Sequence, residues 1–270
     1  MIFHSLNELS HTYDHVYLSP HLDDAALSCG GVIAAQQHAG QRVLVVTLCT
    51  ATPSPEGPFS ELAQAFHTAW GLGPAAVVAT RLREDEAAMA LLGADGLWAG
   101  CLDAIYRHPT TYTSRATLFH QPAADDPLYS EITPLLIALR ERLPEAAFYA
   151  PLGIGAHVDH LLTHAAARTV LGTNLIYYED IPYAIRLGAL AERLAKVDLP
   201  LNKQIIVIDA TLDTKLAAIA AYTSQMVELA QSQLGLTVDA VTDASAALTA
   251  AIAAYAHQVG GALPAERIWV

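Results

Sequence analysis

The segment Val43-Leu44-Val45-Val46-Thr47-Leu48 limits the fold most strongly, because it is apolar on both faces of an extended chain. A strand with two apolar faces belongs inside a parallel sheet that helices cover on each side. His15 to Ser19 predicts an earlier strand, and small residues from about 25 to 39, closed by Gly40, predict the helix between the two. The first 50 residues therefore predict a strand-helix-strand unit.

The rest of the chain continues this alternation. Apolar runs predict further strands at 77–80, 97–102, 147–151, 175–178 and 205–208. Helical patterns occur at 60–70, 83–92, 131–142 and 159–170, and two apolar stripes near the C-terminus predict one helix over 212–229 and another over 248–259. Residues 106–130 lack periodicity and predict a long loop. We expect one domain over residues 1–270, an α/β, Rossmann-like three-layer sandwich with a mainly parallel sheet.

Charge and cysteine usage exclude several classes of protein. The 270 residues hold 14 Lys and Arg against 27 Asp and Glu, a formal net charge of −13. Nucleic acids and anionic membrane surfaces attract basic proteins, so we expect neither as a partner. The three cysteines form no close pair, which favours reduced thiols. No apolar run reaches the ~18 residues that a membrane span needs, and no secretory signal is evident. We expect a cytoplasmic protein.

The first segment with chemical character is Ser19-Pro20-His21-Leu22-Asp23-Asp24, at the end of the first strand. Open α/β sheets place ligand sites beyond the carboxyl ends of their strands. A turn can point His21 and Asp24 the same way, and imidazole with carboxylate suits zinc. The alternative is that an Asp here only caps the following helix.

A second segment, Gly153-Ile154-Gly155-Ala156-His157-Val158-Asp159-His160, also follows a strand. Catalytic zinc commonly takes three protein ligands and leaves one position for water. His21, Asp24 and one histidine of the second segment make such a set, with His164 as a rival to His160 at helical spacing. The remaining Asp and His are then free to act as base and acid.

These two segments resemble the motifs of the PIG-L/LmbE family, zinc-dependent de-N-acetylases of N-acetylglucosaminyl substrates. The family's Pro/Ala-His-Pro-Asp-Asp corresponds to Pro20-His21-Leu22-Asp23-Asp24, and its His-Pro-Asp-His corresponds to His157-Val158-Asp159-His160. The similarity extends in order through Gly30-Gly31, Arg83-Glu84-Asp85-Glu86, Leu102-Asp103 and Glu266-Arg267-Ile268-Trp269. It covers most of the chain and implies a single deacetylase domain of this family.

The resemblance implies that His21, Asp24 and His160 bind one Zn²⁺ ion per chain. It makes Asp23, the first Asp of the pair, the general base.

The other roles implied by the resemblance belong to four residues. His157 would be the acid or electrostatic partner, oriented by Asp159. Arg83, from an Arg-x-x-Glu helix, and Asp103, after the next strand, would contact the sugar.

Three positions depart from the family's pattern. Leu22 replaces the usual Pro, Ala25 stands where Glu is common, and Gly155 stands where some members carry a Tyr that helps to stabilise the oxyanion. Residues 51–74 and 106–130 are the expected sources of specificity. Glu179-Asp180, after a further strand, is a candidate for the pocket rim.

The sequence thus predicts a hydrolase that cleaves the N-acetyl amide of an N-acetylglucosamine-type conjugate, with a small molecule as its partner. It leaves the oligomeric state open, including a homo-oligomer. The alternative is a non-catalytic, Rossmann-like sugar- or nucleotide-binding protein, although no GxGxxG follows the first strand. A two-metal phosphoesterase would need more ligands than these segments supply.

Overall fold

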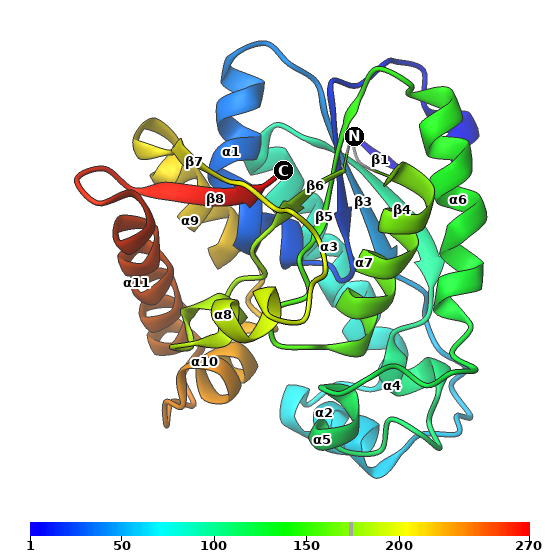
Figure 1. Ribbon diagram of the computed structural model, residues 1–270. Helices are drawn as coiled ribbons and strands as arrows, with labels where there is room; N and C mark the ends of the chain where they lie inside the picture. Colours follow the sequence, from blue (N-terminus) through cyan, green and yellow to red (C-terminus); the bar gives the residue numbers. More distant parts are fainter. Residues whose placement is uncertain (173–174) are drawn as a thin grey trace.

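The computed structural model describes residues 1–172 and 175–270 (Figure 1). Within them, eight strands form one sheet in the order β1-β4-β3-β2-β5-β6-β8-β7. The strands are β1 Ile2–Phe3, β2 His15–Ser19, β3 Val43–Cys49, β4 Asp95–Cys101, β5 Ala147–Pro151, β6 Leu175–Tyr178, β7 Lys203–Val207 and β8 Ala265–Trp269. β1 to β6 pair in parallel, whereas β8 runs antiparallel to both β6 and β7. The α/β class and mainly parallel sheet are confirmed.

Helices cover both faces of this sheet (Figure 1). On one face α1 packs against α3 and α9, and on the other α6 packs against α7. The helices are α1 Asp24–His38, α2 Glu61–Trp70, α3 Pro74–Leu92, α4 Ala104–Arg107, α5 Arg115–Leu118, α6 Leu128–Arg142, α7 Val158–Leu171, α8 Ala189–Leu194, α9 Leu212–Ala220, α10 Met226–Leu234 and α11 Val241–Gly260. All seven residues of β3 are buried between these layers, as the doubly apolar pattern predicts.

The chain changes direction across the sheet between β2 and β5. From β2 it passes through α1 to β3 on one side, whereas from β5 it passes through α7 to β6 on the other. Where neighbouring strands lead away in opposite directions, their connections diverge and leave a crevice at the carboxyl ends. The two segments with chemical character follow these two strands, so the topology brings them together.

Two secondary-structure predictions are wrong near the N-terminal half of the sheet. Residues 77–80 are not a strand, because α3 begins at Pro74 and buries Val77 and Val78 against the core. Proline is favourable at the first helical position, and this start outweighs the strand preference of two valines. Residues 106–130 are not a continuous loop, since they contain α5 and the ends of α4 and α6.

The predicted helix over 212–229 is also wrong, because it is divided into α9 and α10. Glu84 of α3 causes the break by binding the connecting residues. Its carboxylate accepts hydrogen bonds from the Thr223 hydroxyl and from the amide and hydroxyl of Ser224. An acceptor from a distant helix is invisible to the local apolar pattern.

The C-terminal strand β8, which the apolar pattern did not predict, lies between β6 and β7 and connects the sheet to α1. The Glu266 carboxylate accepts the amide protons of Gly31 and Val32 at 3.0 and 2.9 Å, and pairs with the buried Lys215 ammonium at 2.6 Å. Gly31 has room for no side chain here, since a Cβ atom would lie 2.6 Å from Ile208. In the described part of the chain, no helix combines the length and apolar character needed to cross a membrane.

Candidate active site

The site is assembled from the turns that follow β2 and β5. These strands are neighbours, with His15 to Tyr17 paired to Ala147 to Tyr149, so their ends lie side by side. After β5 the chain turns through Gly153 and Gly155, both with positive φ, before His157 starts α7 as its N-cap. The two turns therefore project His21, Asp24, His157 and His160 towards each other.

A compact cluster of metal-binding side chains results. Asp24 Oδ2 lies 3.2 Å from His21 Nδ1 and 3.3 Å from His160 Nε2. The nearest ring nitrogens of His21, His157 and His160 lie within 4.8 Å of one another. All four side chains are buried. The fold thus brings into contact two segments that lie over 130 residues apart in the sequence.

The donor set fits a zinc ion. Donor atoms that share a tetrahedral zinc at ~2.0–2.2 Å are separated by about 3.3 Å, as are those around Asp24 Oδ2. His160 Nε2 is buried and has no hydrogen-bond partner among the described residues, so the 3.3 Å contact to Asp24 is not an aligned hydrogen bond. A buried nitrogen of this kind needs a partner, and a cation would supply one.

Two further carboxylates hold the outer nitrogens of the histidines. Asp180 Oδ1 lies 2.7 Å from His160 Nδ1, and Asp159 Oδ2 lies 3.0 Å from His21 Nε2. A histidine that donates one N–H to a carboxylate presents the lone pair of its other nitrogen to a metal. The paired carboxylates thus select the tautomers that leave His160 Nε2 and His21 Nδ1 available.

These supporting carboxylates are themselves fixed. Asp180 Oδ2 accepts the amide protons of Gly153 and Ile154. Asp159 Oδ1 accepts a 2.6 Å hydrogen bond from the buried Arg107 guanidinium, which also pairs with Asp126. Burial alone would raise the pKa of Asp159, but Arg107 and the hydrogen bond from His21 hold that pKa well below its usual value.

The expected contact between Asp159 and His157 needs correction. Among the described residues, no hydrogen bond joins the Asp159 carboxylate to the His157 ring, because that carboxylate is engaged with His21 and Arg107. The backbone amide of Asp159 instead donates to His157 Nδ1 at 3.2 Å. Asp159, two residues after the N-cap of α7, therefore orients the imidazole through its backbone amide, which leaves the ring proton on His157 Nε2.

Cys49 completes a second group of potential ligands with His21 and Asp159. Its thiol donates to Asp159 Oδ2 over 3.7 Å, and burial raises its pKa well above the usual value. A protonated thiol is a poor metal ligand. Cys29, Cys49 and Cys101 are all free thiols, as predicted.

Asp23 occupies the N-cap position of α1 but makes no capping hydrogen bond with its side chain. Its carboxylate is nearly buried in the pocket, 3.6 Å from the Arg81 guanidinium. Burial raises the pKa of Asp23, and Arg81 opposes that change. The capping alternative therefore lacks its hydrogen bond, and the carboxylate is free to act on a ligand.

The charges of the cluster favour a positive centre beside Asp24. Burial would lower the pKa of His160, but the carboxylates of Asp24 and Asp180 outweigh burial and raise it to about 9. Burial and the neighbouring His21 lower the pKa of His157 well below 6.5. His157 is thus a neutral imidazole at pH 7. A positive charge is favoured instead between the Asp24 carboxylate and the His160 ring.

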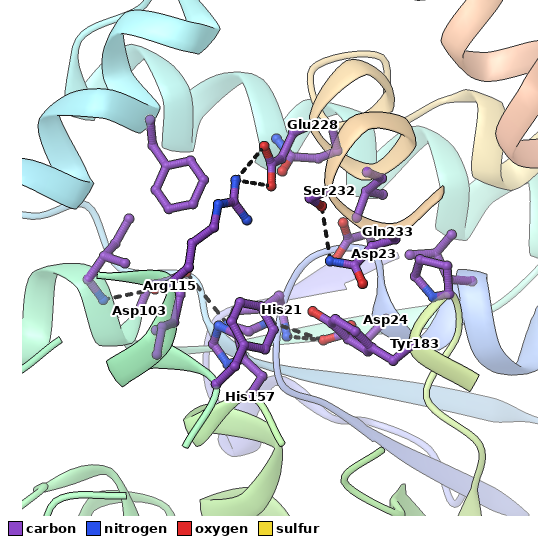
Figure 2. Close-up of a pocket in the computed structure, with 18 of the residues that line it drawn as sticks. His21, Asp23, Asp24, Asp103, Arg115, His157, Tyr183, Glu228, Ser232 and Gln233 are labelled. Atoms are coloured by element: carbon purple, nitrogen blue, oxygen red, sulfur yellow. Dashed lines mark hydrogen bonds and ion pairs between the residues drawn. The ribbon is translucent and has the colours of Figure 1, made fainter. Parts of the chain in front are cut away.

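A pocket opens above these residues (Figure 2). Asp103 lies in it, with Oδ2 3.6 Å from His21 Nε2, while its other oxygen caps α4. Arg83 does not line this pocket, and the expectation that it does is wrong. It is exposed and its guanidinium bonds back to Ala79 and Thr80 of its own helix. Arg81, two residues earlier and on another face of α3, is the arginine that faces Asp23.

Other expected candidates lie elsewhere. His164 turns towards the Pro151 carbonyl and stacks on Tyr177, and burial lowers its pKa to about 4. Of the pair after β6, Asp180 supports His160, whereas Glu179 bonds to Tyr255 and Trp269 on the opposite side. The strand-end position marks Asp180, but no local pattern marks Arg107 or the pocket residues Arg115, Tyr183 and Glu228.

The fold and this cluster define a class of protein, namely an α/β protein with a metal-type site of His and Asp at the switch point of its sheet. The profile of the PIG-L family, described as GlcNAc-PI de-N-acetylase, matches residues 16–171, more than half of the chain. The chain belongs to the PIG-L family.

Related proteins agree with this assignment. The chain is 31% identical over 172 residues to 2'-N-acetylparomamine deacetylase of Streptomyces fradiae, over 62% of this chain and 56% of that protein. The match thus spans less than two thirds of that relative. A teicoplanin-pathway deacetylase superposes with a TM-score of 0.76 at 28% identity, over 94% of this chain and 96% of that one. A zinc-inhibited form of teicoplanin deacetylase superposes with a TM-score of 0.75 at 27% identity, with the same coverage of both chains.

Proposed function

We propose that the protein is a zinc-dependent hydrolase that removes the acetyl group from the amide of an N-acetylglucosamine-type sugar conjugate. The products would be acetate and a free amine. One observation carries the proposal: Asp24 Oδ2 lies 3.2 Å from His21 Nδ1 and 3.3 Å from His160 Nε2, in a pocket that also holds an Asp23 carboxylate without a capping hydrogen bond. The relatives named for deacetylation of N-acetylparomamine and of teicoplanin support the reaction type.

His21, Asp24 and His160 would hold one zinc ion per chain. When bound there, zinc acts as a Lewis acid towards a carbonyl oxygen and makes a water more acidic. The neighbouring carboxylates of Asp159 and Asp180 keep the two histidine rings in the orientation that binding requires.

Asp23 would act as the general base. It would take a proton from the attacking water as the new C–O bond forms, and it would return that proton to the nitrogen as the C–N bond breaks. The raised pKa of Asp23, caused by burial, brings the carboxylate closer to the pH at which it can do both.

His157 would donate a hydrogen bond rather than a proton. Its Nδ1 accepts the Asp159 amide proton, so the proton on Nε2 can point at the oxygen that gains negative charge. Asp103, and Arg81 in place of Arg83, would contact hydroxyl groups of the sugar. Asp159 would hold His21 with its carboxylate and His157 with its amide.

We further propose that the chain forms one Rossmann-like, three-layer domain with a small-molecule partner. Support comes from the single sheet, whose strands run from Ile2 to Trp269, with helices on both faces. Relatives solved with small ligands, including teicoplanin, support a small-molecule substrate.

The test is metal analysis of the purified protein together with acetate release from N-acetylglucosamine conjugates. We expect about one zinc per chain, with acetate release lost after chelation and restored by zinc. N-acetylparomamine and an N-acetylated pseudoaglycone should be included beside N-acetylglucosamine. If the protein holds no zinc and releases acetate from none of these conjugates, the non-catalytic binding protein is favoured instead.

A further inference from the structure

Tyr183 is a pocket residue that the sequence motifs do not include. It lies in the short 3-10 helix Tyr183–Ile185 after β6, three residues beyond the carboxylate that supports His160. Figure 2 shows its side chain on the side of the pocket where His21 and Asp24 lie. The segment after β6 therefore supplies both the Asp180 carboxylate that supports His160 and a phenol that lines the pocket.

The position of the ring depends on Gly155. A Cβ atom at residue 155 would lie 2.6 Å from Tyr183 Cγ and 2.7 Å from Cδ1, closer than atoms in contact can approach. Gly155 also has a φ of +85°, which favours glycine. The ring of Tyr183 thus fills the space that a side chain from the turn after β5 would occupy.

Two aromatic neighbours fix the direction of the phenol. The Tyr183 ring stands edge-on to His160, with centroids 5.6 Å apart, and at 5.8 Å from Phe119. Phe119 in turn lies edge-on to His157 at 5.1 Å. Held by Gly155, His160 and Phe119, the ring has little freedom to move away from the cluster.

The hydroxyl group of Tyr183 has no hydrogen-bond partner in the described part of the chain. Within residues 1–172 and 175–270 it makes no hydrogen bond, although the phenols of Tyr13, Tyr17, Tyr112, Tyr178, Tyr222 and Tyr255 all do. A phenol is an O–H donor at neutral pH. The Tyr183 side chain lines the pocket, so this donor is available to a ligand.

We propose that the Tyr183 hydroxyl donates a hydrogen bond to the carbonyl oxygen of the scissile amide. The inference rests on the proposed deacetylation. As water attacks, the new C–O bond forms and the carbonyl π electrons move to that oxygen, so the bond from Tyr183 strengthens while its proton stays on the phenol. A donor of this kind, aimed at developing charge, accelerates the step itself rather than binding alone. Tyr183 is then a further catalytic residue, opposite His157.

The first test is Tyr183→Phe, which removes the donor and keeps the ring. We expect kcat to fall about 10²- to 10³-fold, with KM within twofold and zinc content and melting temperature unchanged. Tyr255→Phe is the matched control, because that phenol bonds to Glu179 away from the pocket, and its kcat should not change. A rise in KM at constant kcat would assign Tyr183 to a sugar hydroxyl and overturn the proposal.

Gly155→Ala provides a second variant, since its methyl group would push the ring aside. It should lower kcat in the natural background but add little to Tyr183→Phe, because the donor is already gone. Equal losses in both backgrounds would contradict the proposal.

A substrate-independent measurement separates this inference from the proposed function. Methylphosphonate carries tetrahedral anionic oxygens like those of the hydrolytic intermediate. Calorimetry on the zinc-loaded proteins should show that Tyr183→Phe binds methylphosphonate at least tenfold more weakly. If the natural protein releases no acetate but this difference in affinity remains, the proposed deacetylation is wrong and the proposed role of Tyr183 as a hydrogen-bond donor is supported. No difference between the two proteins, including no binding by either, overturns the donor.

Discussion

On the floor of the pocket, Asp24, Asp159 and His160 are almost fully buried and each is held by several partners, whereas on the rim Arg115 and Glu228 hold mainly each other. The floor follows β2 and β5, which are central strands of the sheet. The rim comes from α5 and α10, short helices in connecting segments, and its paired side chains are 47% and 20% exposed. Figure 2 shows this ion pair across the opening from His21.

This difference predicts a division of labour. Buried charges with fixed partners keep their geometry, which the chemistry of an amide requires. Exposed pairs contribute little to stability and can be exchanged without loss of the fold. We therefore expect substitutions on the floor to change the metal or the rate, and substitutions on the rim to change the choice of substrate.

The largest effect should come from the dipeptide on the floor. Asp23→Asn should lower kcat by about 10²–10⁴ while zinc stays near one per chain, because it removes only the base. Asp24→Asn should instead weaken zinc retention, because one anionic ligand is lost. Metal content and kcat measured on both variants test the assignment. Turnover close to the natural level in Asp23→Asn would discard the mechanism.

The next effect concerns the support of His160. Asp180→Asn removes the charge behind its Nδ1, and zinc affinity should fall about 10- to 100-fold. The neighbouring Glu179→Gln is a matched control, since Glu179 faces Tyr255 and Trp269 and should leave zinc affinity unchanged. Titration with a zinc-buffering chelator measures both. An equal loss in the two variants would mean that the segment matters only for folding.

A smaller effect should appear in the pH dependence of stability. Burial raises the pKa of Asp85, on α3 behind Arg81, to about 7, although Trp98 and Tyr222 donate to its carboxylate. The unfolded chain releases this proton near pH 3.8, so the native state holds it more tightly. Between about pH 4 and pH 7 this group therefore lowers stability as the pH rises, and above pH 7 its effect is constant.

Asp85→Asn should abolish that dependence. Between pH 5 and pH 8, the natural protein should lose about 3 kcal/mol more stability than the variant. Urea unfolding at the two pH values provides the measurement. Asp125→Asn is the control on the exposed side, since its side chain is 81% exposed. Parallel pH profiles for Asp85→Asn and the natural protein would show that the buried carboxyl does not titrate in this range.

The smallest effect on stability should come from the rim. A double-mutant cycle of Arg115→Ala and Glu228→Ala should give a coupling of ~0–1 kcal/mol, because both side chains are partly exposed and solvent screens the pair. Zinc content should stay the same, and KM should change by a few-fold, more for bulky conjugates than for N-acetylglucosamine. If kcat fell as far as in Asp23→Asn, the division between floor and rim would be wrong.

Much of the floor could be predicted from the sequence because its determinants are local. A strand apolar on both faces identifies the parallel sheet, and polar residues directly after two such strands identify the edge at which ligands bind. His21, Asp23, Asp24, His157 and His160 all lie where those patterns expect. The sequence predicts a pocket contact for Arg83, but Arg81 is the arginine that faces Asp23. An Arg-x-x-Glu pattern occurs at both positions, and only the packing of α3 distinguishes the two faces of the helix.

The tertiary structure alone decided which groups support these residues. Arg107 reaches Asp159 from 52 positions away, Glu84 divides two helices 139 positions further on, and Tyr183 fills the space above Gly155. Local periodicity records which face of an element is buried, but it carries no information on which distant side chain meets it. Those partners depend on the order of strands in the sheet and on loop conformation, both of which arise only when the whole chain packs.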